Sequence, residues 1–348
     1  MTDLWLRGGA FVVGLLLVLV FLQSVLRVAI VNRQRGDRLA RAIGHVVYTA
    51  VASLARRQRG YGKVQDALAW VLPIYILALI GFWFLLVQVG FSLLIWALQA
   101  EHSLLQAIIA SGSALSTLGF LTPPDISGQL LAIPEGAFGL GIVVFFFTFI
   151  PGYQTTIQQR EVQVAWLYAR CGADPTAAGF IEWLQRSGKA RDMIAVWEDW
   201  ETWFRLLIET HTLAPVVSFV PSVHRGQSWL VAATIVLDSA SFWLSALDDE
   251  AQSAAALCHA TGVRALRLVV AQHRVRDVRD VTGSRRGGFD RAAFEAARER
   301  LAALGVPARA DADASWQGFA ALRREYEVPL EQLAAILLVP IEGGMHGG

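Results

Sequence analysis

The stretch Ser116-Thr117-Leu118-Gly119-Phe120 lies between two long apolar parts of the chain and decides how they are interpreted. Residues 102–114, which precede it, have the spacing of a short helix whose apolar positions are predicted to pack along one face: Leu104, Leu105, Ile108 and Ile109. Such a helix is too short to cross a bilayer. After the stretch, Pro123-Pro124-Asp125 ends any helix and turns the chain. The pattern predicts a half-helix followed by an extended return, which is the form of a re-entrant membrane loop.

Three apolar runs around this loop have the length of membrane spans. The first covers residues 10–31, the second residues 67–99, and the third runs from about residue 137 to residue 150. We therefore predict an all-α membrane protein with three transmembrane helices per chain and a re-entrant pore loop between the second and third. An all-α cytoplasmic domain follows them. The predicted divisions are 1–32 (N-terminal span), 33–66 (basic amphipathic segment), 67–160 (span, short helix, loop and span) and 161–348 (helical domain with a loosely ordered tail).

The composition agrees with a membrane protein that carries a large soluble part. The 348 residues are 55% hydrophobic, which is too apolar for an ordinary soluble enzyme, and the 17% of charged residues are unevenly placed. Cys171 and Cys258 have no metal-ligand spacing, and we interpret them as buried thiols in a reducing compartment. No GxGxxG, phosphate-binding loop, nucleophile elbow or zinc spacing is found. We therefore expect no enzyme, no cofactor and no nucleic-acid partner.

The distribution of basic residues predicts the orientation. Between residues 33 and 63 there are eight Arg or Lys residues and one acid, Asp37, whereas residues 100–136 contain no Arg or Lys. The positive-inside rule places the first loop and everything after about Tyr153 in the cytoplasm. We expect a multi-pass protein of a bacterial inner (plasma) membrane, with the loop at 116–120 opening outside. Its acids, Glu101, Asp125 and Glu135, either concentrate cations at the outer mouth or are solvated loop acids.

The remaining segments are predicted to be helical. Residues 38–59 have basic ends and an apolar middle, which fits either a helix lying on the inner leaflet or a linker helix covering the soluble domain. Helical patterns continue at about 175–187, 189–213, 229–247, 251–276, 290–304 and 315–338. Residues 229–247 resemble a span, but Asp238 and several serines favour a helix buried at the centre of the bundle.

The second and third spans with their loop resemble the pore module of potassium channels, and more loosely the pore repeats of Trk/Ktr-type potassium transporters. Potassium channels carry a Thr-Val-Gly-Tyr-Gly-like filter, and the corresponding residues here are Thr117 to Leu121. Leu121 departs from the usual glycine, and a non-glycine residue at positive φ would cost about 1–3 kcal/mol. The resemblance implies that the ion ligands are the carbonyls of Thr117, Leu118, Gly119 and Phe120, with the Thr117 hydroxyl at the inner end. Thr117 and Gly119 would contact potassium, and Ser113 and Ser116 would support the loop from behind.

The same resemblance implies a homotetramer, because one loop per chain cannot surround an ion. The third span would line the inner pore, and Gly139, Gly141, Pro151 and Gly152 offer places where it can bend. Alternatively, Gly139 and Gly141 allow close helix packing. No bound cofactor is implied beyond the permeant potassium ion. Membrane lipids, and an unidentified cytoplasmic effector, are the other partners compatible with this interpretation.

Two classes of function remain open at this point. One is a cation channel subunit, with potassium as the expected ion, that conducts passively through a carbonyl-lined filter and is gated with the help of the cytoplasmic domain. The other is a membrane-anchored signalling or scaffold protein whose helical domain is the functional part, in which case residues 116–120 form an external turn. An enzyme with an unrecognised active site has no support beyond scattered acids and histidines.

Overall fold

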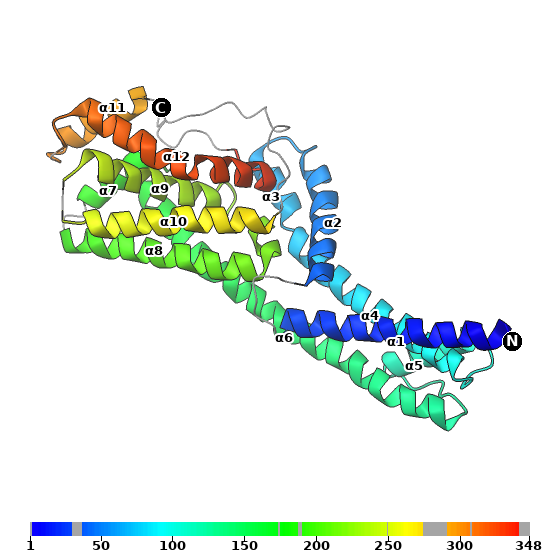
Figure 1. Ribbon diagram of the computed structural model, residues 1–348. Helices are drawn as coiled ribbons and strands as arrows, with labels where there is room; N and C mark the ends of the chain where they lie inside the picture. Colours follow the sequence, from blue (N-terminus) through cyan, green and yellow to red (C-terminus); the bar gives the residue numbers. More distant parts are fainter. Residues whose placement is uncertain are drawn as a thin grey trace. The chain divides into compact units, whose positions relative to one another are not determined.

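The computed structural model describes residues 2–29, 37–172, 175–186, 190–248, 250–273, 291–306 and 308–340, which are overwhelmingly helical. The only extended pairing among them is a bridge between Leu247 and Ala308. The elements are α1 (Thr2–Ala29), α2 (Arg38–Ala55), α3 (Tyr61–Leu68), α4 (Val71–Ala97), α5 (Leu104–Leu115), α6 (Ile126–Cys171), α7 (Ala177–Arg186), α8 (Ala190–Leu213), the 3-10 helix η1 (Pro215–Phe219), α9 (Trp229–Ala246), α10 (Gln252–Gln272), α11 (Arg291–Ala303) and α12 (Ala312–Leu337) (Figure 1).

The chain divides into two compact units. Unit 1 comprises residues 1–49 and 72–155, and unit 2 comprises residues 50–71 and 156–348. The basic segment expected at 33–66 is thus shared between the units instead of standing alone. Its residues Arg33 and Arg35, and the tail from residue 341, lie outside the described residues.

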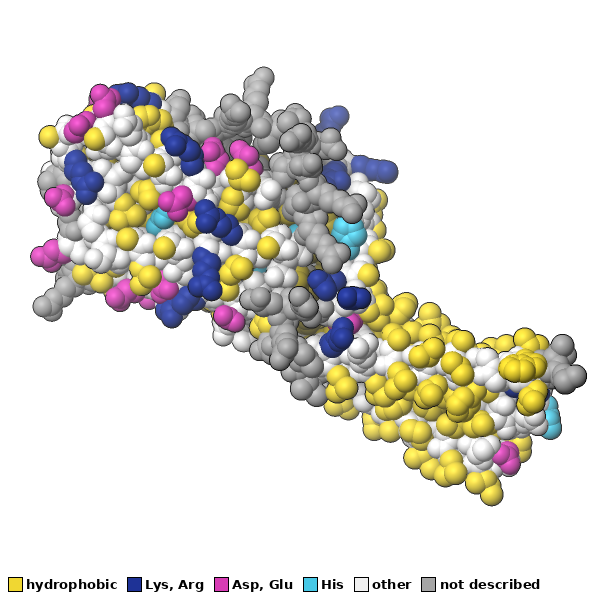
Figure 2. Space-filling view, viewed as in Figure 1, with side chains coloured by type: hydrophobic (Ala, Val, Ile, Leu, Met, Phe, Trp, Pro, Cys, Tyr) yellow, Lys and Arg dark blue, Asp and Glu magenta, His cyan; other side chains and the backbone are white. Residues whose placement is uncertain are grey.

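Within the described residues, five helices are long and apolar enough to cross a membrane. Three of these apolar windows lie in α1, in α3–α4 and in α6, and only 22%, 39% and 17% of them, respectively, are buried. Figure 2 shows hydrophobic side chains covering most of the visible surface of unit 1, whereas charged side chains gather on unit 2. The surface of unit 1 is therefore suited to lipid. The all-α membrane class is confirmed at this level, while the division into three spans and a pore loop remains a prediction.

Helices α1 and α4 approach closely because both carry glycine at their crossing. A Cβ added at Gly14 would lie 2.7 Å from the carbonyl oxygen of Gly90, and one added at Gly90 would lie 3.1 Å from that of Gly14. Near the start of α1, Arg7 donates to the Trp96 carbonyl at 2.9 Å, and its guanidinium lies over the Trp96 ring. Small residues at a helix crossing are a usual way to pack helices in lipid, where backbones gain dispersion contacts by approaching closely.

Asp37, one of the two acids of the basic segment, holds the start of α2 against two other helices of unit 1. Its carboxylate accepts the Ala40 N–H at 3.0 Å, which caps α2, and the Ser24 hydroxyl at 2.7 Å. Ser24 in turn accepts the Trp83 indole N–H of α4 at 3.0 Å. Since Asp37 and Ser24 are buried, this chain of hydrogen bonds fixes α1, α2 and α4 together.

Unit 2 is a helical bundle built around α9. The apolar window of α9 is 89% buried, and α9 packs against α7, α10 and α12 (Figure 1). Its one acid, Asp238, is buried, accepts the Tyr326 hydroxyl at 2.5 Å and lies 3.5 Å from the Arg323 guanidinium. The prediction of a buried central helix is confirmed, because a carboxylate with such partners belongs inside a protein and not against lipid.

Helix α3 also belongs to unit 2, where it meets the loop before α9. The Gln65 side chain donates to the Gln227 carbonyl at 2.7 Å and accepts the Gly226 N–H at 2.9 Å, while Asp66 pairs with Arg225. The buried Arg160 of α6 donates to the carbonyls of Val217 and Val220 in the same region. Side chains from α3 and α6 therefore hold one stretch of the bundle, residues 217–227.

Candidate functional site

Helix α5 is the short helix that the sequence predicts before the loop. Ser103 caps it by accepting the Gln106 N–H at 3.2 Å, and its 12 residues are far fewer than the roughly 20 needed to span a bilayer. The face that it buries differs from the prediction. The buried positions are the small residues Ala107, Ala110, Ser111 and Ser113 together with Leu115, whereas the expected packing residues Leu104, Leu105, Ile108 and Ile109 are 40–67% exposed.

The small face is buried because it lets α4 and α6 come close to the backbone of α5. A Cβ added at Gly136 of α6 would lie 3.3 Å from the Ala114 carbonyl oxygen, and one at Gly139 would overlap the Leu115 carbonyl. The large aliphatic side chains of α5 point away from this contact and are left for lipid or a second chain. The expected packing face was wrong because periodicity finds an apolar stripe but does not say whether protein or lipid covers it.

The loop after α5 has an unusual backbone. Thr117 has φ +59° and Gly119 has φ +66°, whereas Leu118 and Phe120 between and after them are outside the positive-φ region. Leu121 is also outside it, so the strain expected at Leu121 is absent and falls on Thr117 instead. Glycine adopts positive φ without cost, but a β-branched threonine there is strained by about 1–3 kcal/mol.

Ser113 fastens one side of this loop to α5. Its hydroxyl accepts the Leu121 N–H at 2.9 Å, and its carbonyl accepts the Gly119 N–H at 3.1 Å. Ser116, the other expected support, donates its hydroxyl to the Gly112 carbonyl of its own helix at 2.6 Å, and its carbonyl accepts the hydroxyl of the adjacent Thr117 at 2.7 Å. The structure thus brings Ser113 and the loop together and leaves Ser116 as the end of α5.

The carbonyl oxygens of the loop are left open by the part of the chain that the structure describes. Within the described residues, none of the carbonyls of Thr117, Leu118, Gly119 and Phe120 accepts a hydrogen bond. The side chains of Leu118 and Phe120 are 73% and 66% exposed. Because backbone carbonyls need a partner, these oxygens are available to water, an ion or another chain.

Of the three acids expected either to concentrate cations at the mouth or to be solvated, only Asp125 is exposed. Asp125 is exposed, but it caps α6 by accepting the Ser127 N–H at 3.1 Å, and its hydrogen bonds from Ser127 lower its pKa. Glu101 and Glu135 are buried, with exposed fractions of 6% and 0%. Glu135 lies inside α6 because that helix begins at Ile126, well before the predicted start near residue 137. The Asp125 cap explains the earlier start, and Pro134 is accommodated within the helix.

The four expected hinge residues of α6 have different surroundings. Gly139 is packed against the end of α5, which supports its alternative role in close packing. A Cβ at Gly141 or Gly152 would meet nothing within 4 Å, and Pro151 interrupts the helical hydrogen bonding without ending α6. Gly141, Pro151 and Gly152 are therefore the expected hinge residues at which α6 has room to bend.

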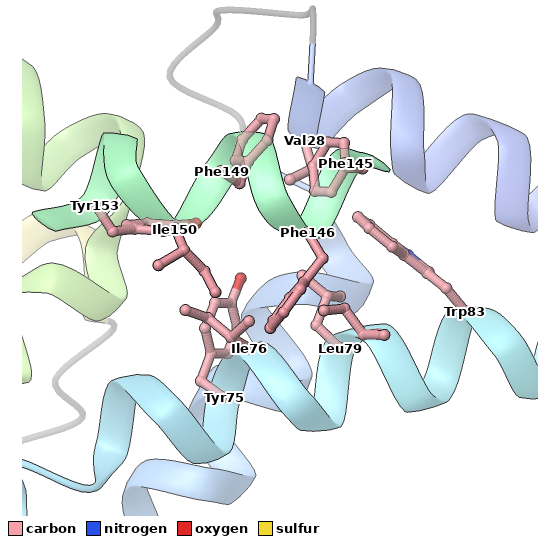
Figure 3. A pocket seen from close by; sticks show the side chains of 11 residues that line it. Val28, Tyr75, Ile76, Leu79, Trp83, Phe145, Phe146, Phe149, Ile150 and Tyr153 are labelled. Carbon is pink, nitrogen blue, oxygen red and sulfur yellow. The ribbon is translucent and has the colours of Figure 1, made fainter. Parts of the chain in front are cut away.

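A small apolar hollow lies beside this part of α6 (Figure 3). It is formed by Val28 of α1, by α4, and by α6 residues from Phe145 to Tyr153; its α4 residues are Tyr75, Ile76, Leu79, Ile80 and Trp83. The lining offers aromatic and aliphatic surface, so it suits movement of side chains better than binding of a dehydrated cation.

No model of a known protein family, no curated protein and no solved structure matches this chain.

Sequence reasoning missed the polar side chains that hold α5 in place. Gln88 of α4 donates to the Ile108 carbonyl at 2.8 Å, and the Ser111 hydroxyl lies 3.1 Å from the Gln88 carbonyl and hydrogen-bonds with Glu135. The available signal was Gln88 itself, the main polar residue in the second apolar run, since a polar side chain at membrane depth needs a partner.

Among the described residues there is no cluster of His, Cys, Asp and Glu that could hold a metal ion.

Proposed function

We propose that this chain is a subunit of a cation channel, in which carbonyl oxygens of residues 117–120 replace the water shell of a potassium ion. One observation carries the proposal. Four consecutive carbonyls have no donor among the described residues, while the N–H groups of Gly119 and Leu121 donate to Ser113. Because two N–H groups of the loop are hydrogen-bonded while its carbonyl oxygens are open, these oxygens can bind a cation.

The position of α5 supports the same ligand. The carboxyl end of a helix carries partial negative charge, and α5 ends at Leu115, directly before the loop. The stretch from α4 to α6 has the order of a long apolar helix, a short helix, an irregular loop and a second long apolar helix. Irregular backbone is tolerated at membrane depth where protein or a water-filled cavity covers it.

A closed ring of chains is part of the proposal, because one loop surrounds nothing. Head-to-tail contacts that close by rotation give cyclic oligomers, and the resemblance to potassium channels makes four the expected number. The exposed apolar side chains Leu118 and Phe120 on the loop and Ile126, Leu130 and Ile133 on α6 are available to contact neighbouring chains. The part of α6 near Pro151 and Gly152 is the proposed gate, and unit 2 is proposed to lie in the cytoplasm.

The test is ion flux into liposomes containing the purified protein, comparing potassium with sodium. The chain offers a matched pair of variants, because Gly119 and Gly305 both have positive φ and open space around an added Cβ. Alanine in a left-handed conformation costs ~1–2 kcal/mol per chain. In a ring of four, we expect Gly119→Ala to lower potassium flux at least tenfold, and Gly305→Ala to leave it within twofold. Equal flux for wild type and Gly119→Ala, or no flux from intact wild-type oligomers, would contradict the proposal.

A further inference from the structure

Glu135 is a buried carboxyl group without an obvious use in ion conduction. It lies on α6, has 0% exposure, and one of its oxygens, Oε1, is hydrogen-bonded with the hydroxyl of Ser111 on α5. Within the described residues its other oxygen, Oε2, has no hydrogen-bond partner. A buried carboxylate with an unpaired oxygen is far more costly than a neutral carboxylic acid in the same place.

The protons around Ser111 can be counted. The Ser111 hydroxyl lies within hydrogen-bond distance of two acceptors, Glu135 Oε1 and the Gln88 carbonyl oxygen, the latter at 3.1 Å. A hydroxyl has one proton and can satisfy only one of them. If Glu135 carries a proton on Oε1, it donates to Ser111, and Ser111 donates to Gln88. A neutral Glu135 therefore completes the chain of hydrogen bonds from α6 through α5 to α4.

Gln88 extends this chain to a second point on α5. Its amide donates to the Ile108 carbonyl at 2.8 Å and lies beside Gly112, where an added Cβ would be in ordinary contact with the amide nitrogen at 3.5 Å. Ser92 donates to the Gln88 carbonyl at 2.6 Å. Helix α5 is thus held at Ile108 and Ser111, close before Ser113, which fastens the loop.

We propose that Glu135 is a neutral positioning residue, which with Ser111 and Gln88 holds α5 in the register that presents the carbonyls of residues 117–120. It does not touch the ion. This inference rests on the proposed function. In it, the buried acid Glu135 of α6 keeps the geometry of the loop constant.

The test compares Glu135→Gln with Glu135→Leu in the full-length protein. The glutamine amide can donate to Ser111 as the neutral acid does, whereas leucine cannot. We expect Glu135→Gln to keep the potassium-to-sodium flux ratio within twofold of wild type and Glu135→Leu to lower it at least fivefold. Thr49→Val, which removes a hydrogen bond within α2 from Thr49 to the His45 carbonyl, is the control and should leave the ratio unchanged.

Two further measurements keep the outcome clear. Ser111→Ala removes only a hydroxyl from a face of small residues, so it should fold. It should also lower the potassium-to-sodium flux ratio, and it therefore tests the inference even if Glu135→Leu fails to assemble. Infrared spectroscopy should detect the carbonyl stretch of a protonated carboxyl group in wild type that is missing in Glu135→Gln. An unchanged ratio in both Ser111→Ala and Glu135→Leu, a Glu135→Gln variant as impaired as Glu135→Leu, or the absence of that infrared band would overturn the inference. The infrared result does not require conduction, so it separates this inference from the channel proposal.

Discussion

The backbone conformation of Thr117 is energetically unfavourable, although the proposed function requires this residue as an ion ligand. Its φ of +59° is unfavourable for a β-branched side chain, and its hydroxyl donates to the adjacent Ser116 carbonyl at 2.7 Å. Gly119, two residues on, adopts similar backbone at no steric cost. A strained residue persists only where its surroundings hold it, and here the end of α5 and the Ser113 contacts do so.

This conflict predicts the effect of Thr117→Gly. Removing the side chain should relieve strain and raise the stability of the assembled protein by about 1 kcal/mol, less the extra chain entropy of glycine. It should also weaken the preference for potassium over sodium, because a proposed hydroxyl ligand is lost. Leu338→Gly is the matched control, since Leu338 has φ +53° at the end of α12.

Thermal unfolding followed by tryptophan fluorescence and flux ratios in liposomes are the two measurements. Both variants should gain stability, and only Thr117→Gly should change the flux ratio. If Thr117→Gly gained stability with an unchanged ratio, the Thr117 hydroxyl would have no part in selectivity.

At the scale of elements, the contact between α5 and α6 determines where the loop lies. Gly136 and Gly139 bring the backbone of α6 against the last turn of α5, and Glu135 adds a hydrogen bond beside them. Van der Waals contact between backbones is a main source of helix association in lipid, so glycine at these positions is a packing requirement.

Gly139 and Gly141 of α6 should therefore respond differently to substitution by alanine. Gly139→Ala forces a Cβ into the Leu115 carbonyl and should destabilise the protein by about 1–3 kcal/mol. Gly141→Ala meets nothing within 4 Å and should be neutral or stabilising by up to about 1 kcal/mol, because alanine favours the helix. Unfolding of the purified protein in detergent measures both. Equal effects of the two substitutions would show that α5 does not rest on Gly139.

At the scale of the whole molecule, the interior of unit 2 contains buried histidines, and their burial predicts that the stability of unit 2 depends on pH. His211 is completely buried, and burial lowers its pKa well below the usual value, with further lowering from Arg160 and His273. Burial lowers the pKa of His273 to about 4. Both histidines are therefore neutral in the folded protein at pH 7.

Unfolded histidine titrates near pH 6.5, so between that value and about pH 4 the unfolded chain binds more protons than the folded one. The stability of unit 2 should be complete above about pH 6.5 and fall by about 3 kcal/mol or more towards pH 4, because the lowered pKa of His273 alone accounts for about 3 kcal/mol. Tryptophan fluorescence of the full-length protein during denaturant unfolding measures this decline. Replacing both histidines with glutamine should flatten the curve, whereas replacing the exposed His102 should not. A curve that is equally steep without His211 and His273 would contradict the assignment.

Much of this architecture follows from apolar periodicity and helix ends. The patterns at 189–213 and 229–247 correspond to α8 and α9 within a residue or two, and the short helix before the loop is α5. The first three turns or so of α6 were missed because their pattern is mixed and Asp125 was interpreted only as part of a turn. Contacts between distant residues could not be predicted either. Nothing local in the sequence indicates that Glu135 hydrogen-bonds with Ser111, or that Gln65 pairs with residues 226 and 227.

The most direct measurement is an electron cryomicroscopy or crystal structure of the protein in a lipid environment, with potassium replaced by a heavier monovalent cation that scatters strongly. The account predicts a ring of chains with cation density on its symmetry axis, surrounded by carbonyl oxygens of residues 117–120 from each copy. A monomer or dimer, or a ring in which these carbonyls face bulk water away from the axis, would contradict it.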